Sequence, residues 1–327
     1  MARPRTDHQL LLDESFDDLD AVREMVGGWD LDLLQLERGA FRGRVRQWRS
    51  GRLFFARARF ARRVSQRGAP PGGALTLAVP ASDEFEVRWR GRPALSNDIM
   101  VFPAEGELDV VSSSTFDVFT ISLPVPDWSR LGHDAGALAE LTAEQGGRVC
   151  QCLPDSMGVL RQALRRAEAT AIDQDASEEA TIPMLALEAI RTAVAPSGEV
   201  QSGSDRRRAF LGAVAYIDAK LNRRIRIADV CRSTGVSERT LQYAFQAELG
   251  LTPMQYLHAR RLQRARRELT RASPRRGIID GIARAHGLRH GGRFADDYRA
   301  MFGERPSETL RRNTLGRKNS NEECAGG

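Results

Sequence analysis

The sequence of 327 residues has few cysteines and histidines, and it lacks a long apolar stretch. No run approaches the ~18 consecutive apolar residues that a membrane-spanning helix needs. The first twenty residues place several acidic side chains close behind their only apolar cluster, whereas a secretory signal begins with basic residues and has an uninterrupted apolar core. We therefore expect a cytoplasmic protein that does not associate with membranes.

The cysteines and histidines are also too sparse for ordinary metal or redox chemistry. Cys150 and Cys152 are separated by one residue, which is neither the C-x-x-C of redox enzymes nor an ordinary zinc spacing. We interpret them as reduced, unreactive thiols; a redox sensor or a soft metal site is the alternative. His133 is the only histidine in residues 20–204, whereas a metal-dependent enzyme site on a β-barrel needs a cluster of histidines and a carboxylate.

Other signatures of catalysis are missing too. The sequence has no Gly-rich phosphate loop, no nucleophile elbow and no His-Glu-x-x-His pair. A repair methyltransferase would need a reactive cysteine in a Pro-Cys context, which is also missing. We therefore expect no enzymatic activity, no cofactor and no metal.

Charge divides the chain unequally. The length suits about two domains, and 49 basic against 43 acidic residues give the whole chain a net charge of +6. From Asp205 to the end there are 26 basic and 13 acidic residues, which leaves 23 basic and 30 acidic residues in the rest. A basic third attached to an acidic remainder is typical of a phosphate-binding module joined to a separate domain.

Residues 29–125 have the two-residue alternation of β-strands. In 41–46 arginines alternate with apolar or small residues, and in 54–61 apolar and charged residues alternate after a Ser-Gly turn. Shorter strands are predicted at 75–79, 86–89, 99–102, 107–111 and 118–123. Many short strands separated by turns predict an antiparallel barrel or sandwich.

The pattern then changes to helical spacing. Amphipathic helices are predicted at 155–170, with Leu160, Leu164 and Ala167 in its stripe, and at 178–194. The second stripe consists of Leu185, Ile190 and Val194. These helices either pack on their own β-domain or form a dimer interface. The Ser/Gly/Pro-rich stretch 195–204 that follows reads as a linker.

The basic third contains two related segments in tandem. Residues 227–236 align with 279–288 at an offset of 52, with isoleucine on isoleucine, arginine on arginine and glycine on glycine. After one added residue the match continues at an offset of 53, where Leu241, Phe245, Leu249, Gly250 and Pro253 align with Phe294, Tyr298, Phe302, Gly303 and Pro306. The basic third therefore holds two copies of one structural unit.

Each copy has the pattern of a helix-turn-helix. A short helix ends at Gly235 in the first copy and at Gly287 in the second, because glycine tolerates the left-handed conformation that closes such a helix. Ser237 can cap the next helix, in which Leu241 and Phe245 belong to a buried stripe. The residues left facing outward are Arg239, Thr240, Gln242 and Tyr243.

A third helix is predicted between the two copies, with Thr252 as its cap and Pro253 in its first turn. About 17 residues make a rod of roughly 25 Å. Such a rod can hold two recognition helices about 34 Å apart, one turn of B-DNA, on the same face of the duplex. Its exposed side is expected to carry Arg260, Arg261, Arg264, Arg266 and Arg267.

These residues resemble a known family. The resemblance rests on four sequence segments: Gly-Val-Ser-Glu-Arg-Thr-Leu-Gln-Tyr-Ala-Phe at 235–245, Glu-Leu-Gly-Leu-Thr-Pro-Met-Gln-Tyr-Leu at 248–257, Arg-Arg-Leu-Gln-Arg-Ala-Arg at 260–266 and Phe-Gly-Glu-Arg-Pro-Ser-Glu-Thr-Leu-Arg at 302–311. Residues 227–270 followed by 278–312 look like the DNA-binding domain of AraC/XylS-type regulators. In that family the exposed positions of each recognition helix contact bases, and Arg and Gln side chains can reach guanine and adenine edges.

The resemblance therefore implies a set of DNA contacts. Predicted base contacts are Arg239, Thr240, Gln242, Tyr243, His290 and Arg293. Predicted phosphate contacts are Ser237, Arg260, Arg261, Arg264, Arg289 and Arg299. The second helix-turn-helix copy departs from the family pattern, since Gly291 and Gly292 offer no side chains and Asp296 and Asp297 repel phosphate. We expect this second copy to contact fewer bases. The alternative interpretation of His290 and Arg293 is that they are simply exposed residues at the cap of the helix.

For the N-terminal half the resemblance implies a cupin-like β-domain that senses a small molecule and often dimerises. The ligand residues cannot be identified from the sequence. Trp48, Trp89, Arg88 and Arg90 could line a pocket, but core tryptophans and solvent-facing arginines are the favoured interpretation.

The combined prediction is an α+β chain with an N-terminal antiparallel β-barrel, a helical region and an all-α tandem helix-turn-helix domain. The expected boundaries are 1–154 for the sensing domain, 155–204 for the helices and linker, 205–315 for the DNA-binding domain and 316–327 for a disordered tail. The expected function is that of a homodimeric, sequence-specific transcriptional regulator.

By the family resemblance, this regulator is an activator that binds double-stranded promoter DNA, works with RNA polymerase and responds to an unidentified small-molecule effector. One alternative is a redox- or quorum-responsive regulator of the same fold. The other is a sequence-nonspecific DNA-binding protein.

Overall fold

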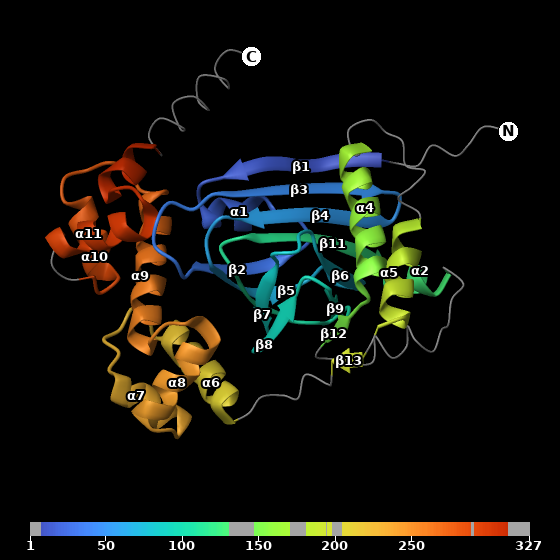
Figure 1. The fold of residues 1–327 in the computed structure, drawn as a ribbon. Coiled ribbons are helices and arrows are strands. Elements are labelled where there is room, and N and C mark those ends of the chain that lie inside the picture. The colour runs from blue at the N-terminus through green and yellow to red at the C-terminus, as the bar shows by residue number, and fades with distance from the viewer. Residues whose placement is uncertain are drawn as a thin grey trace, which may run out of the picture. The chain divides into compact units, whose positions relative to one another are not determined.

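The structure is a computed structural model that describes residues 8–130, 147–170, 181–193, 195–197, 205–288 and 291–312 (Figure 1). His133, Val194, Arg289, His290 and the tail at 316–327 lie outside the described residues. The chain divides into two compact units, one of residues 1–33 and 42–202 and the other of residues 34–41 and 203–327. No helix in the described ranges is both long and apolar enough to span a membrane.

Two antiparallel sheets make up the first unit. The larger sheet has the order β1 (His8–Phe16), β3 (Gly43–Ser50), β4 (Leu53–Phe60), β11 (Phe116–Pro124), β6 (Ala74–Pro80), β9 (Asp98–Phe102), β12 (Arg148–Gln151) and β13 (Ala195–Ser197). The smaller sheet has the order β2 (Asp30–Gln35), β5 (Val64–Ala69), β10 (Leu108–Ser112), β7 (Glu86–Trp89) and β8 (Arg92–Leu95).

The described strands thus form an antiparallel two-sheet arrangement, so of the two predicted alternatives, barrel and sandwich, the closed barrel was wrong. The alternation of residues along a strand indicates which of its faces is buried, but it does not indicate which strand edges pair with one another. Pairing is decided by contacts between distant segments, such as β4 with β11 and β10 with β5.

Helices flank these sheets. Within this unit they are α1 (Leu19–Met25), α2 (Val125–Arg130), α4 (Pro154–Thr170) and α5 (Ile182–Arg191). Both α4 and α5 lie against one face of the larger sheet, where Leu160, Leu164 and Ile182 share a core with Phe55 and Phe119 (Figure 1). Of the two alternatives for these helices, the structure thus has both packed on their own β-domain.

The predicted stripe of α4 is buried, whereas that of α5 was displaced. Leu185 and Ile190 are only partly buried, and the buried residues of α5 are Ile182, Pro183, Ala186 and Ala189. Alanines are weak apolar signals, so the sequence pattern favoured the larger residues beside them.

The outer face of the larger sheet also carries an ion-pair network. Arg46 and Arg57, on neighbouring strands, share the carboxylate of Glu168 from α4, and each also pairs with an aspartate, Asp13 or Asp117. The arginine alternation predicted a water-facing side for these strands. The structure instead places Arg46 and Arg57 partly under α4, with carboxylates that compensate their charge.

The second unit is helical. It contains α6 (Asp205–Ala219), α7 (Ile227–Thr234), α8 (Glu238–Leu249), α9 (Pro253–Leu269), α10 (Ile278–Ala285) and α11 (Gly291–Phe302), and residues 306–312 are helical as well. The pairs α7–α8 and α10–α11 correspond to the two copies found in the sequence. Between them, α9 contributes Leu262, Ala265 and Leu269 to the core of the second copy.

Candidate nucleic-acid interface and an interior cavity

The turn of the first helix-turn-helix follows from its local sequence. Gly235 closes α7 with φ of 69°, in the left-handed region that glycine adopts without strain. Two residues later Ser237 caps α8, and its hydroxyl accepts a hydrogen bond from the backbone N–H of Thr240 at 3.2 Å. Thr252 caps α9 in the same way, with Pro253 in the first turn. The caps predicted from the sequence are confirmed.

The inner side of α8 anchors the helix. Leu241, Phe245 and Leu249 are buried as predicted. The ring of Phe245 meets Phe210 at a centroid distance of 5.0 Å and Tyr256 at 5.6 Å, both edge to face. Phe210 belongs to α6, a helix that the sequence analysis did not predict. Because α8 is packed on this side, its opposite side is held rigidly toward solvent.

That outer side carries the predicted recognition residues, namely Arg239, Thr240, Gln242 and Tyr243, which are all exposed. The guanidinium of Arg239 donates to the hydroxyl of Tyr243 at 3.0 Å and lies 5.2 Å from the centre of its ring. Gln242 donates to Glu238 at 3.2 Å. The structure therefore brings Arg239 and Tyr243 together as one unit of defined direction, one turn of helix apart.

The second recognition helix, α11, presents a different surface. Arg293, Asp296 and Arg299 are exposed, while Phe294 and Tyr298 are buried on the other side. The two aspartates of this helix, Asp296 and Asp297, differ in their exposure and contacts. Asp296 is exposed, whereas Asp297 is half-buried and lies 3.2 Å from His258 and 3.9 Å from Arg293.

Asp297 is therefore partly engaged within the domain, so its charge is less available to repel phosphate than the sequence suggested. Burial lowers the pKa of His258, and the neighbouring Arg261 and Arg293 lower it further against the opposite effect of Asp297. The base contact proposed for His290 and the phosphate contact proposed for Arg289 lie outside the described residues.

Helix α9 has the predicted 17 residues, but its arginines are buried or partly buried, whereas the sequence predicted an exposed basic side. Arg260 pairs with Asp218 at 2.9 Å, and Arg261 donates to the backbone carbonyls of Leu221 and Arg223. Arg266 is 4% exposed, pairs with Glu304 at 3.1 Å and lies over the ring of Phe302 at 4.7 Å.

These three arginines connect α9 to neighbouring segments of its own unit. Arg260 and Arg261 therefore have a structural role within this unit, and the phosphate contacts predicted for them stay predictions. Arg264 is half-buried and Arg299 is exposed. Phosphate contacts by these two residues and by Ser237 stay predictions.

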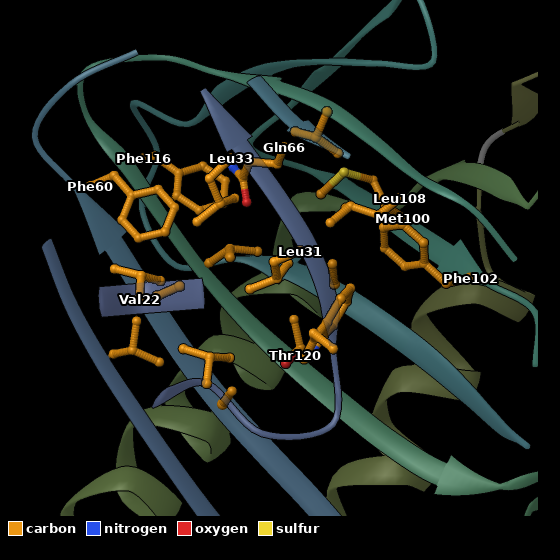
Figure 2. A pocket seen from close by; sticks show the side chains of 18 residues that line it. Val22, Leu31, Leu33, Phe60, Gln66, Met100, Phe102, Leu108, Phe116 and Thr120 are labelled. Carbon is orange, nitrogen blue, oxygen red and sulfur yellow. The ribbon is translucent and has the colours of Figure 1, made fainter. Parts of the chain in front are cut away.

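The first unit contains an apolar cavity between its two sheets (Figure 2). The cavity has a volume of about 80 Å³. Its lining consists of Val22, Val26, Trp29, Leu31, Leu33, Val45, Ala56, Ala58, Phe60, Gln66, Ala78, Met100, Phe102, Leu108, Val110, Phe116, Val118 and Thr120.

Strand alternation explains the position of the cavity. On β4, Phe55 faces α4 and α5, while Ala56, Ala58 and Phe60 face the space between the sheets. Ala78 on β6 adds a third small side chain to this side of the larger sheet. Small residues here leave room that larger ones would fill, so the two sheets enclose space instead of a solid core.

The tryptophans and arginines considered as ligand residues are not part of this cavity. Trp48 and Trp89 are fully buried, Trp48 stacked on Phe55 at 5.2 Å and Trp89 edge to face with Phe102. The interpretation of both tryptophans as core residues is confirmed.

The cysteine pair is also buried. Cys152 is 2% exposed, its thiol donates to the carbonyl of Cys150, and burial raises its pKa to about 12, with Cys150 adding to the effect. Reactive sensor thiols are exposed and have a lowered pKa. The geometry therefore argues against the redox alternative.

Comparison with known proteins places the resemblance in the second unit. Residues 230–312 match the model of a family described as a helix-turn-helix domain. The probable thc operon regulatory protein of Rhodococcus erythropolis is 46% identical over 99 residues, 30% of this chain and 30% of that protein. The XylDLEGF operon transcriptional activator 1 of Pseudomonas putida is 34% identical over 106 residues, 32% of each. The chain thus spans about a third of the length of these curated relatives.

Solved structures match as well. The crystal structure of a probable AraC family transcriptional regulator from Rhodopseudomonas palustris is 40% identical to this chain, covers 32% of this chain and 96% of its own, and has a TM-score of 0.30. That of the AraC-like transcriptional activator CuxR is 17% identical, covers 79% of this chain and 96% of its own, and has a TM-score of 0.41. The match to the family model, over residues 230–312, covers the helices that carry the candidate DNA interface.

Proposed function

We propose that the whole chain is a sequence-specific regulator of transcription of the AraC/XylS type, because residues 230–312 match a helix-turn-helix family model and about a third of the chain is similar to operon regulatory proteins. Its target is double-stranded promoter DNA. The observation that carries the proposal is the exposed face of α8, where Arg239 and Tyr243 are held together on a helix packed from behind. Such a helix fits the major groove, and its Arg and Gln side chains suit guanine and adenine edges.

The proposal includes activation, because relatives carry the name of operon transcriptional activators. It also includes work with RNA polymerase, a homodimeric state and a cytoplasmic location, as the family resemblance implies. The first unit is proposed as a cupin-like sensing domain, with the cavity between its sheets as the site of a small-molecule effector.

Footprinting the purified full chain on the DNA upstream of its own gene and of neighbouring genes tests this function. We expect protection of discrete sites that persists when heparin or random duplex DNA competes. A footprint without sequence preference, or affinity for genomic duplexes no greater than for heparin, would overturn the proposal and favour the sequence-nonspecific alternative.

A further inference from the structure

Two polar side chains in the apolar cavity have unpartnered atoms. The amide nitrogen of Gln66 and the hydroxyl of Thr120 are both buried without a hydrogen-bond partner, and each residue is only 8% exposed. They come from opposite sheets, Gln66 from β5 and Thr120 from β11, and both line the cavity (Figure 2). A buried polar group without a hydrogen-bond partner destabilises the folded state, so a bound molecule that forms a hydrogen bond with either group would remove this penalty.

The charge of the lining restricts what that partner can be. None of the described residues around the cavity is acidic or basic. A carboxylate, phosphate or ammonium group enclosed there would lose its hydration without gaining an opposite charge, which disfavours the ionised form. The amide nitrogen of Gln66 is a donor and requires an acceptor, whereas the hydroxyl of Thr120 can donate or accept.

We propose that the cavity binds a small, uncharged, mainly hydrophobic molecule whose carbonyl or similar oxygen accepts a hydrogen bond from Gln66, with Thr120 as a second polar contact. The cavity volume of about 80 Å³ restricts this ligand to a small molecule. This inference rests on the proposed sensing role of the first unit and names the chemical class of the effector.

Three matched series of probes test the class by isothermal titration calorimetry on the full chain at neutral pH. The ketones are acetophenone and methyl naphthyl ketone. Ethylbenzene and ethylnaphthalene have a methylene in place of the carbonyl and so lack the acceptor, and benzoate and naphthoate have a carboxylate in place of the acetyl group and so carry a charge. We expect a ketone to bind about three- to tenfold more tightly than its hydrocarbon and at least about a hundredfold more tightly than its carboxylate.

Substitutions at the cavity locate the binding. Gln66→Met should remove the preference for ketone over hydrocarbon without lowering the melting temperature of the free protein, since it removes an unpartnered group. Ala58→Leu, which fills the cavity, should abolish binding of both. If Gln66→Met fails to fold, Thr120→Val is the second test and should weaken ketone binding about three- to tenfold.

Thr76→Val is the matched control for the threonine change. Thr76 is buried in the larger sheet, but its hydroxyl is satisfied at 2.8 Å from that of Ser122, and it does not line the cavity. This control should lower the melting temperature and leave ketone affinity unchanged.

The inference is overturned if neither ketone binds, if a carboxylate binds as tightly as its ketone, or if Ala58→Leu leaves binding intact. DNA footprinting of the same preparation distinguishes a failure of the proposed ligand class from a failure of the proposed function. Discrete footprints without ketone binding reject the ligand class and keep the proposed function. Ketone binding without discrete footprints rejects the proposed function.

Discussion

Removal of the Arg239 side chain is the most direct test of how this protein reads DNA. A bidentate contact from arginine to guanine contributes about 1–3 kcal/mol of discrimination, which corresponds to about a 5- to 150-fold change in Kd. The structure favours a clear effect, because the bond to Tyr243 at 3.0 Å and the stacking at 5.2 Å hold the guanidinium in one direction before DNA arrives. Arg239→Ala should therefore lose affinity for the recognised site and relax its preference at one base pair.

Fluorescence anisotropy at fixed salt, with the footprinted site and each of its single-base variants, measures both effects. Arg232→Ala is the control, since Arg232 is a 78% exposed arginine on α7 that pairs with Asp229 and is not a predicted DNA contact. The control should bind every site like the unchanged protein. An equal loss of affinity by Arg239→Ala on all sequences would show a phosphate contact and refute the base-reading role.

Four further predictions concern the salt response, stability and titration. Arg264→Ala should weaken all DNA sites alike and reduce the slope of log affinity against log salt by about one; an unchanged slope would reduce Arg264 to a solvated residue. Phe245→Ala should destabilise the C-terminal unit by about 3–5 kcal/mol in urea unfolding, because it empties a fully buried aromatic site; a change below about 1 kcal/mol would contradict the packing. Cys152, with a pKa of about 12, should have only about one thiol in a hundred thousand ionised at pH 7, so a thiol reagent should label it only after unfolding, and rapid labelling of the native protein would revive the redox alternative. His258 has a lowered pKa in the folded state, so the unfolded chain takes up protons first and melting temperature should fall as pH drops below about 6.5; His258→Asn should weaken this fall, and an identical fall in both proteins would exclude His258 as its source.

The parts of the interface that could be predicted are those governed by short-range chemistry. A glycine at the end of a short helix and a serine two residues later specify the turn and the cap, so Gly235 and Ser237 were identified from the sequence alone. The four-residue spacing of Leu241 and Phe245 then determined which side of α8 is buried, and the exposed side followed. The alignment of the two copies located the second helix-turn-helix by the same signals.

The role of the arginines on α9 could not be predicted in this way. Arg260 and Arg266 have the composition of a DNA-binding face, but their partners Asp218 and Glu304 lie about forty residues away in sequence on either side. A basic run looks the same whether it faces phosphate or distant carboxylates of the same domain. Only the packing of α9 between the two helix-turn-helix units decides between these cases.

The cavity shows where sequence periodicity stops being informative. Alternation in β4 correctly separates an inner face of Ala56, Ala58 and Phe60 from an outer face, but it does not reveal whether the opposite sheet fills the space above the alanines. That depends on how the smaller sheet, which carries Gln66, pairs and lies over the larger one. In the sequence Gln66 is an ordinary polar residue, and its unpartnered amide nitrogen becomes a specific signal only once the surrounding apolar lining is known. The recognition helix is thus encoded within a dozen residues, whereas the proposed effector site arises from strands distributed over a hundred, so a change of effector requires substitutions on several strands while a change of DNA preference can begin at Arg239.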